Sequence, residues 1–165
     1  MNKEDAIVFL KKYQPLPNDG EELEAIISVF DDVLKYFLDN PDPECIPLFL
    51  NCFGQGSGYG VYQLIEDVIS KHNESDVIPH LKNALQSKYS SVRYWCAQIA
   101  ERFESEDLID GLINVYEKGD VDAKCASLTA LSGIKSEKIK SLAKKTLEDE
   151  TDEVLCEIAE DIVSG

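Results

Sequence analysis

A glycine-rich stretch is the first place in this sequence where residue types and spacing suggest a particular chemistry. Residues 54–60 contain four glycines, separated by Gln55, Ser57 and Tyr59. Glycine-rich loops can bring backbone amides close to the phosphates of a nucleotide. This stretch lacks the Lys-Ser/Thr ending of a phosphate-binding loop, and no strand is predicted before it. We therefore interpret it as a flexible or tightly turned connection, and as the irregular segment in which to look for function.

Two histidines and several pairs of adjacent carboxylates have the chemistry for metal binding or acid-base catalysis. Neither His72 nor His80 lies four residues from another His or Cys, the spacing that places two zinc ligands on one helix face. Adjacent acids on a helix point in different directions, so a pair such as Asp31-Asp32 is typical of a solvated face. The sequence therefore predicts no catalytic residue, no metal ligand and no cofactor.

Five cysteines are the remaining reactive side chains. They form an odd set without a CxxC pair, and four of them lie among apolar neighbours at helical spacing. Disulfide frameworks and zinc sites need paired, regularly spaced cysteines. We expect reduced core residues, in preference to disulfides or metal ligands, at Cys45, Cys52, Cys96, Cys125 and Cys156.

The charge of the chain argues against several classes of function. Asp and Glu number 32 against 16 Lys and Arg, which gives a formal net charge of -16. A negative surface repels the phosphate backbone, so no nucleic-acid partner is expected. No apolar run approaches the roughly 20 residues that span a bilayer. Residues 1–5 also lack the basic start of a signal peptide, so we expect a cytoplasmic protein without a membrane partner.

An internal repeat organises the C-terminal part of the sequence. Three segments begin with Val and continue, four and five residues later, with an apolar pair that ends in Ala. Apolar residues at i, i+4 and i+7 or i+8 predict one buried stripe on a helix in each segment. The three stripes are Val92, Cys96, Ile99 and Ala100; Val121, Cys125 and Leu128; and Val154, Ile158 and Ile162.

A second helix precedes each of these segments, and the unit is therefore helix, short turn, helix. The preceding helices are predicted at 77–86, 108–118 and 139–147, and an earlier copy at 46–50 is followed by a helix at 61–70. Two further helices, 3–13 and 21–38, are joined by a breaker at 15–20 and lack the repeat signature. We expect one all-α domain over residues 1–165, with an N-terminal helical cap at 1–43 and about four repeats at 44–165.

The repeat resembles the HEAT family. Val92-Arg93 with Cys96-Ala97 is similar to the opening of the second HEAT helix, whereas Asp122 stands at the arginine position of the next repeat. The resemblance covers roughly residues 45–163 and implies a right-handed α-solenoid. Residues 58–67 and 92–98 are similar to small bacterial HEAT-repeat proteins, a broad class that includes immunity proteins of polymorphic toxin systems.

The second helices of successive repeats line one side of a solenoid, and their polar faces are therefore the expected binding surface. Tyr, Trp and Arg dominate interface hot spots. We expect Tyr62 and Tyr94 to be exposed, whereas Trp95 could equally fill the seam between neighbouring helices. The candidate partner-binding residues are Tyr59, Tyr62, Gln63, Glu66, Asp67, Arg93, Tyr94, Trp95, Gln98 and Glu101.

The expected function is that of a non-enzymatic module whose acidic, aromatic face holds a basic protein partner. In the narrower form of this hypothesis the chain is an immunity protein that neutralises a basic toxin, such as a nuclease. The alternative is a HEAT-like accessory or lyase-type protein that acts on another protein, for which the residues give no support beyond the fold. A DNA-glycosylase-like helical repeat would need a basic face, and the net charge argues against it.

Overall fold

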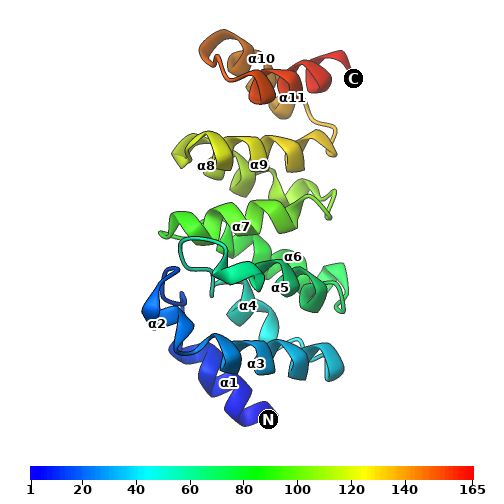
Figure 1. Cartoon of the computed structure of the whole chain (residues 1–165). Helices are drawn as coiled ribbons and strands as arrows, with labels where there is room; N and C mark the ends of the chain where they lie inside the picture. The colour runs from blue at the N-terminus through cyan, green and yellow to red at the C-terminus, as the bar shows by residue number, and fades with distance from the viewer. The chain divides into compact units, whose positions relative to one another are not determined.

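The computed structural model describes all 165 residues and contains eleven α-helices, two short 3-10 helices and no strand (Figure 1). The all-α class predicted from the sequence is confirmed. The chain forms two compact units, residues 1–84 and residues 85–165, which we call unit 1 and unit 2. No helix is both long enough and apolar enough to cross a lipid bilayer.

Unit 1 begins with the two helical stretches predicted as a cap, but the second of them is interrupted. The predicted helix at 21–38 is two helices because Ile26, with φ -121° and ψ -5°, leaves the helical conformation. Leu23, Ile27 and Phe30 keep helical spacing across this break, so the periodicity of the sequence does not reveal it. The helices of unit 1 are α1 (Lys3–Lys12), α2 (Glu21–Glu24), α3 (Ile27–Asp39), α4 (Cys45–Leu50), η1 (Gly58–Gly60), α5 (Tyr62–Ile69) and α6 (Glu74–Ala84).

Aromatic side chains form the centre of unit 1. Phe49 of α4 packs against Phe30 and Phe37 of α3, with ring centroids 6.2 and 5.7 Å apart, and all three are fully buried. Burial of such a side chain contributes about 1.5 to 3 kcal/mol relative to leaving it in water. α1 packs on both α3 and α4, α5 packs on α3, and α6 packs on α4. The short helix α4 is therefore held from several sides.

Unit 2 is built around its third α-helix. Its elements are α7 (Ser90–Ala100), η2 (Glu106–Leu108), α8 (Ile109–Lys118), α9 (Val121–Ser132), α10 (Glu137–Asp149) and α11 (Glu153–Ser164). α9 packs against α7, α8 and α11, and α10 packs against α11 (Figure 1). The side chains of Asp120 and Asp152 accept hydrogen bonds from backbone amides in the first turns of α9 and α11, each at 3.0 Å. These caps lie in the turns where the sequence predicts helix boundaries.

The buried faces of α9 and α11 differ from the predicted stripes. In α7 all four stripe residues are buried, as predicted, but Val121 and Val154 are 43% and 58% exposed. The buried residues of α11 are Leu155 and Ala159, one position after the predicted Val154 and Ile158. Small side chains such as Ala159 let a neighbouring helix approach closely, which leaves the branched residues on the outer face.

All five cysteines are free thiols, but they are not equally buried. Cys45, Cys52 and Cys96 are in the core, as predicted. Cys125 and Cys156 are half-buried, so their interpretation as core residues is wrong. The shifted register of α9 brings Cys125 towards solvent together with Val121, which lies one turn before it.

Candidate functional site

The predicted partner-binding residues divide between the two units. Unit 1 contains Tyr59, Tyr62, Gln63, Glu66 and Asp67, and unit 2 contains Arg93, Tyr94, Trp95, Gln98 and Glu101. Each set is therefore a separate candidate surface.

Tyr62 is a core residue, and the prediction that it is exposed is wrong. It is only 1% exposed, its ring meets Phe53 edge to face at 5.3 Å, and its hydroxyl accepts a hydrogen bond from the Gly54 amide at 2.9 Å. Burial raises the pKa of Tyr62 to about 12. The side chain lies on the inward face of α5 together with Ile65 and Ile69, so a partner cannot contact it.

The other predicted residues of unit 1 lie on or near the surface. Tyr59 is 49% exposed, and its hydroxyl donates to the carboxylate of Glu24 at 3.0 Å. Its φ of 52° is in the left-handed region, which is unusual for a residue other than glycine. Gln63 and Asp67 are exposed, whereas Glu66 is half-buried.

Asp19 holds the glycine-rich loop 54–60 in a fixed turn. Its carboxylate accepts hydrogen bonds from the amides of Ser57 at 3.0 Å and Gly58 at 2.9 Å. A Cβ on Gly54 would lie 2.5 Å from the carbonyl oxygen of Leu16, so glycine is needed for the close approach of the two loops. Of the two interpretations of this stretch, tightly turned is the correct one. Asp19 is not predictable from the sequence as a partner of this loop, because an acid 38 residues away from Ser57 carries no local signal.

A groove crosses α7, α9 and α11 in unit 2. It encloses about 260 Å³. Its residues recur at helical spacing on each helix, because each set lies on one helix face. They are Tyr94 and Gln98 of α7 and its C-cap residue Glu101; Asp122, Cys125, Ala126 and Thr129 of α9; and Val154 and Ile158 of α11. We call this the α7/α9/α11 groove.

Three of the predicted residues come together in this groove. The Gln98 amide nitrogen donates to the Tyr94 hydroxyl at 3.0 Å, and Glu101, the C-cap residue of α7, lines the groove beside them. Trp95 is half-buried and packs edge to face on Tyr94, with ring centroids 5.5 Å apart. Arg93 donates to the backbone oxygen of Ser87 at 2.8 Å and does not line the groove.

The site residues predicted from the sequence do not include the apolar wall of the groove. The sequence pattern places Val154 and Ile158 on the core stripe of α11, and Cys125 on that of α9. The available signal was a pair of neighbours such as Ile158-Ala159, in which only one residue can face the adjacent helix. The smaller residue packs there, and the larger one lines the groove.

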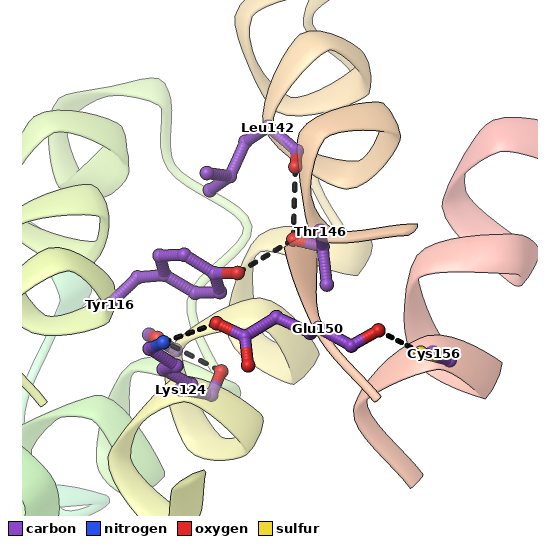
Figure 2. A network of polar contacts seen from close by, with 7 residues as sticks. Tyr116, Lys124, Leu142, Thr146, Glu150 and Cys156 are labelled. Carbon is purple, nitrogen blue, oxygen red and sulfur yellow. Dashed lines mark hydrogen bonds and ion pairs between the residues drawn. The ribbon is translucent and has the colours of Figure 1, made fainter. Parts of the chain in front are cut away.

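Lys124, the basic residue of α9, is held in a polar network that lies outside the groove (Figure 2). Lys124 forms an ion pair with Glu150, and its ammonium lies 5.4 Å from the centre of the Tyr116 ring. The hydrogen bond to Glu150 raises the pKa of Lys124. The backbone oxygen of Glu150 accepts a hydrogen bond from the Cys156 thiol at 3.4 Å, which ties the start of α11 to this network. The groove thus contains two carboxylates, Glu101 and Asp122, and no Lys or Arg.

A cysteine and a histidine lie together in unit 1, but they are not arranged as a nucleophile and its base. The Cys45 sulfur is 3.8 Å from Nε2 of His72, which is half-buried. Burial raises the pKa of Cys45 to about 12 and lowers the pKa of His72. The thiol is therefore protonated at neutral pH and closed to solvent. No group of three or more His, Cys, Asp or Glu is placed to hold a metal ion.

Comparisons of this chain with models of protein families, with curated protein sequences and with solved structures found no match. The resemblance to HEAT repeats and to immunity proteins therefore stays a prediction from the sequence.

Proposed function

We propose that this chain is a non-enzymatic protein-binding module that holds a basic protein partner on the surface around the α7/α9/α11 groove. The observation that carries the proposal is the composition of this groove. Apolar side chains and two carboxylates share one cavity, and the only basic residue of α9 is engaged by Glu150.

The charge around the groove supports a basic partner. α11 carries four exposed acids and no Lys or Arg: Glu153, Glu157, Glu160 and Asp161. Opposite potentials speed the encounter of two proteins and disfavour wrong partners. The net charge of -16 extends this attraction beyond the groove itself.

The narrower proposal is an immunity protein that neutralises a basic toxin, such as a nuclease, by covering part of its cationic surface. In this proposal the chain is a HEAT-like α-solenoid of about four repeats with an N-terminal helical cap. Support comes from the sequence resemblance and from the paired packing of α8 with α9 and of α10 with α11. Burial keeps the Cys45 thiol protonated, so the Cys45–His72 pair gives no support to a catalytic role.

The test is binding to a panel of purified basic nuclease domains, with acidic domains of similar size as negative controls. We expect at least one basic domain to bind, with an association rate that falls as salt rises. Glu101→Lys combined with Asp122→Lys should slow association by about tenfold or more. Asp107→Lys combined with Glu117→Lys is the matched control, because it makes the same change in net charge at exposed residues outside the groove.

Two results would contradict the proposal. One is the absence of binding to any basic domain of the panel. The other is an equal loss of association rate in the groove variant and in its control, because net charge alone would then explain the binding.

A further inference from the structure

The size of the α7/α9/α11 groove limits what it can bind. Its volume of about 260 Å³ is below the 300 to 1,000 Å³ that is typical of small-molecule sites. A space of this size accommodates one long side chain of a partner, not a whole helix or a cofactor.

The walls of the groove suit the methylene part of a long side chain. Val154, which is 58% exposed, and Ile158 form an aliphatic wall on α11. Ala126 and Cys125 of α9 are small and leave the space between the helices open. Lys and Arg side chains commonly bury their apolar stems against such surfaces while the charged end meets a polar group.

The polar groups of the groove suit a cation with several N–H donors. Glu101 at the end of α7 and Asp122 of α9 are exposed, and neither forms an ion pair with a Lys or Arg. Gln98 uses its amide nitrogen for Tyr94, which leaves its side-chain oxygen as a further acceptor. The Tyr94 ring offers a face on which a cation can lie.

These groups favour arginine over lysine. A guanidinium presents five N–H donors in a plane, so it can meet two carboxylates and an amide oxygen at once and still stack on an aromatic ring. An ammonium is a compact, strongly hydrated charge with three donors. We propose that the groove binds one arginine side chain of the basic partner, with the guanidinium at Glu101 and Asp122 beside Tyr94 and the stem on Val154 and Ile158.

This inference rests on the proposed function for the identity of the partner, but its test needs no partner. The probe is a blocked tripeptide, acetyl-Ala-Arg-Ala-amide, titrated into the whole chain and followed by the NMR shifts of the Val154 and Ile158 methyl groups. Matched peptides with lysine or with citrulline in place of arginine separate charge from shape, because citrulline is the neutral counterpart of arginine. A single side chain is expected to bind in the millimolar range.

We expect saturable shifts with the arginine peptide, binding about tenfold weaker with lysine, and no saturation with citrulline. Glu101→Gln and Asp122→Asn should each weaken arginine binding about fivefold or more. Asp107→Asn, at an exposed acid outside the groove, should leave it unchanged. These exposed, nearly isosteric changes keep the fold, which the rest of each NMR spectrum verifies.

Several outcomes would overturn the inference: no saturable shift at Val154 and Ile158, equal binding of the citrulline or lysine peptide, or no effect of either groove variant. The two proposals can fail separately. If the arginine peptide binds but no basic domain does, the arginine site stands and the proposed function fails. If a basic domain binds but the peptide does not, the partner is held by other contacts.

Discussion

Tyr116 and Thr146 form a hydroxyl pair in the interior of unit 2, and its direction can be assigned. The two oxygens are 2.8 Å apart, and the Thr146 hydroxyl also donates to the backbone oxygen of Leu142 at 2.9 Å (Figure 2). A threonine hydroxyl has a single hydrogen. Tyr116 is therefore the donor to Thr146, and this contact ties α8 to α10.

The direction of this contact predicts unequal effects of two substitutions. Tyr116→Phe removes one hydrogen bond and leaves the Thr146 donation intact, so it should cost about 1 kcal/mol. Thr146→Val leaves the buried Tyr116 hydroxyl without an acceptor and should cost about 2 to 3 kcal/mol. The measurement is the free energy of unfolding in urea. The double variant should be less destabilised than Thr146→Val alone, and additive losses would show that the hydroxyls are not coupled.

The buried thiol of Cys45 should make the stability of the chain fall at alkaline pH. Its pKa is raised from 9.0 to about 12 by burial, so the unfolded chain loses this proton first. The stabilising contribution of the protonated thiol is complete below pH 9 and is lost as pH rises towards about 12. Cys45→Ala should therefore make the fall of the unfolding free energy with pH shallower, by up to about 1.4 kcal/mol per pH unit.

Ile46→Val is the control for the alkaline experiment, because it removes packing at a neighbouring buried position without removing a titrating group. If the unfolding free energy falls equally steeply with pH in wild type and in Cys45→Ala, the alkaline loss of stability does not come from the Cys45 thiol.

At the scale of the helix, the register of α11 decides which of its residues are buried and which are exposed. Ala159 is fully buried and Val154 is 58% exposed, although the sequence pattern favours the opposite face. Ala159→Leu should therefore destabilise the chain by about 1 to 3 kcal/mol through overpacking. Val154→Leu adds one methylene on the outer face and should change stability by about 0.5 kcal/mol or less. Thermal or urea unfolding measures the stability of both variants. A larger loss of stability for Val154→Leu than for Ala159→Leu would support the register predicted from the sequence.

The sequence predicts most helices of unit 2 closely, because capping residues such as Asp120 and Asp152 mark where helices begin. It does not predict which member of an apolar pair such as Ile158-Ala159 faces inward, because periodicity allows both and only helix packing decides. The inward position of Tyr62 was missed for a related reason. It depends on a long-range contact with the amide of Gly54 in a loop that Asp19 holds from outside the repeat region.

Of the ten predicted site residues, Tyr94, Gln98 and Glu101 line the groove together, because their i, i+4, i+7 spacing continues along α7 to its C-cap. It does not identify the opposite wall, because Val154 and Ile158 come from another helix and depend on the packing of α11 on α9.

At the scale of the whole molecule, a net charge of -16 implies that the carboxylates repel one another in the folded chain. Raising ionic strength from about 0.01 M to 0.1 M shortens the screening length from about 30 Å to 10 Å. The melting temperature should therefore rise with salt over this range, because self-repulsion is weakened. Binding to a basic partner should weaken over the same range, since screening also reduces attraction. A melting temperature that falls with salt would mean that favourable ion pairs outweigh the repulsion.

The Asp19 carboxylate occupies the amides of Ser57 and Gly58, which are the groups of the glycine-rich loop that could bind another anion. Successive amides in such a loop form an anion-binding nest, and here the chain supplies the anion itself. A tethered carboxylate acts as an intramolecular competitor at an effective concentration of roughly millimolar or higher. A free phosphate at lower concentration would lose this competition, so the loop is already saturated by its own chain.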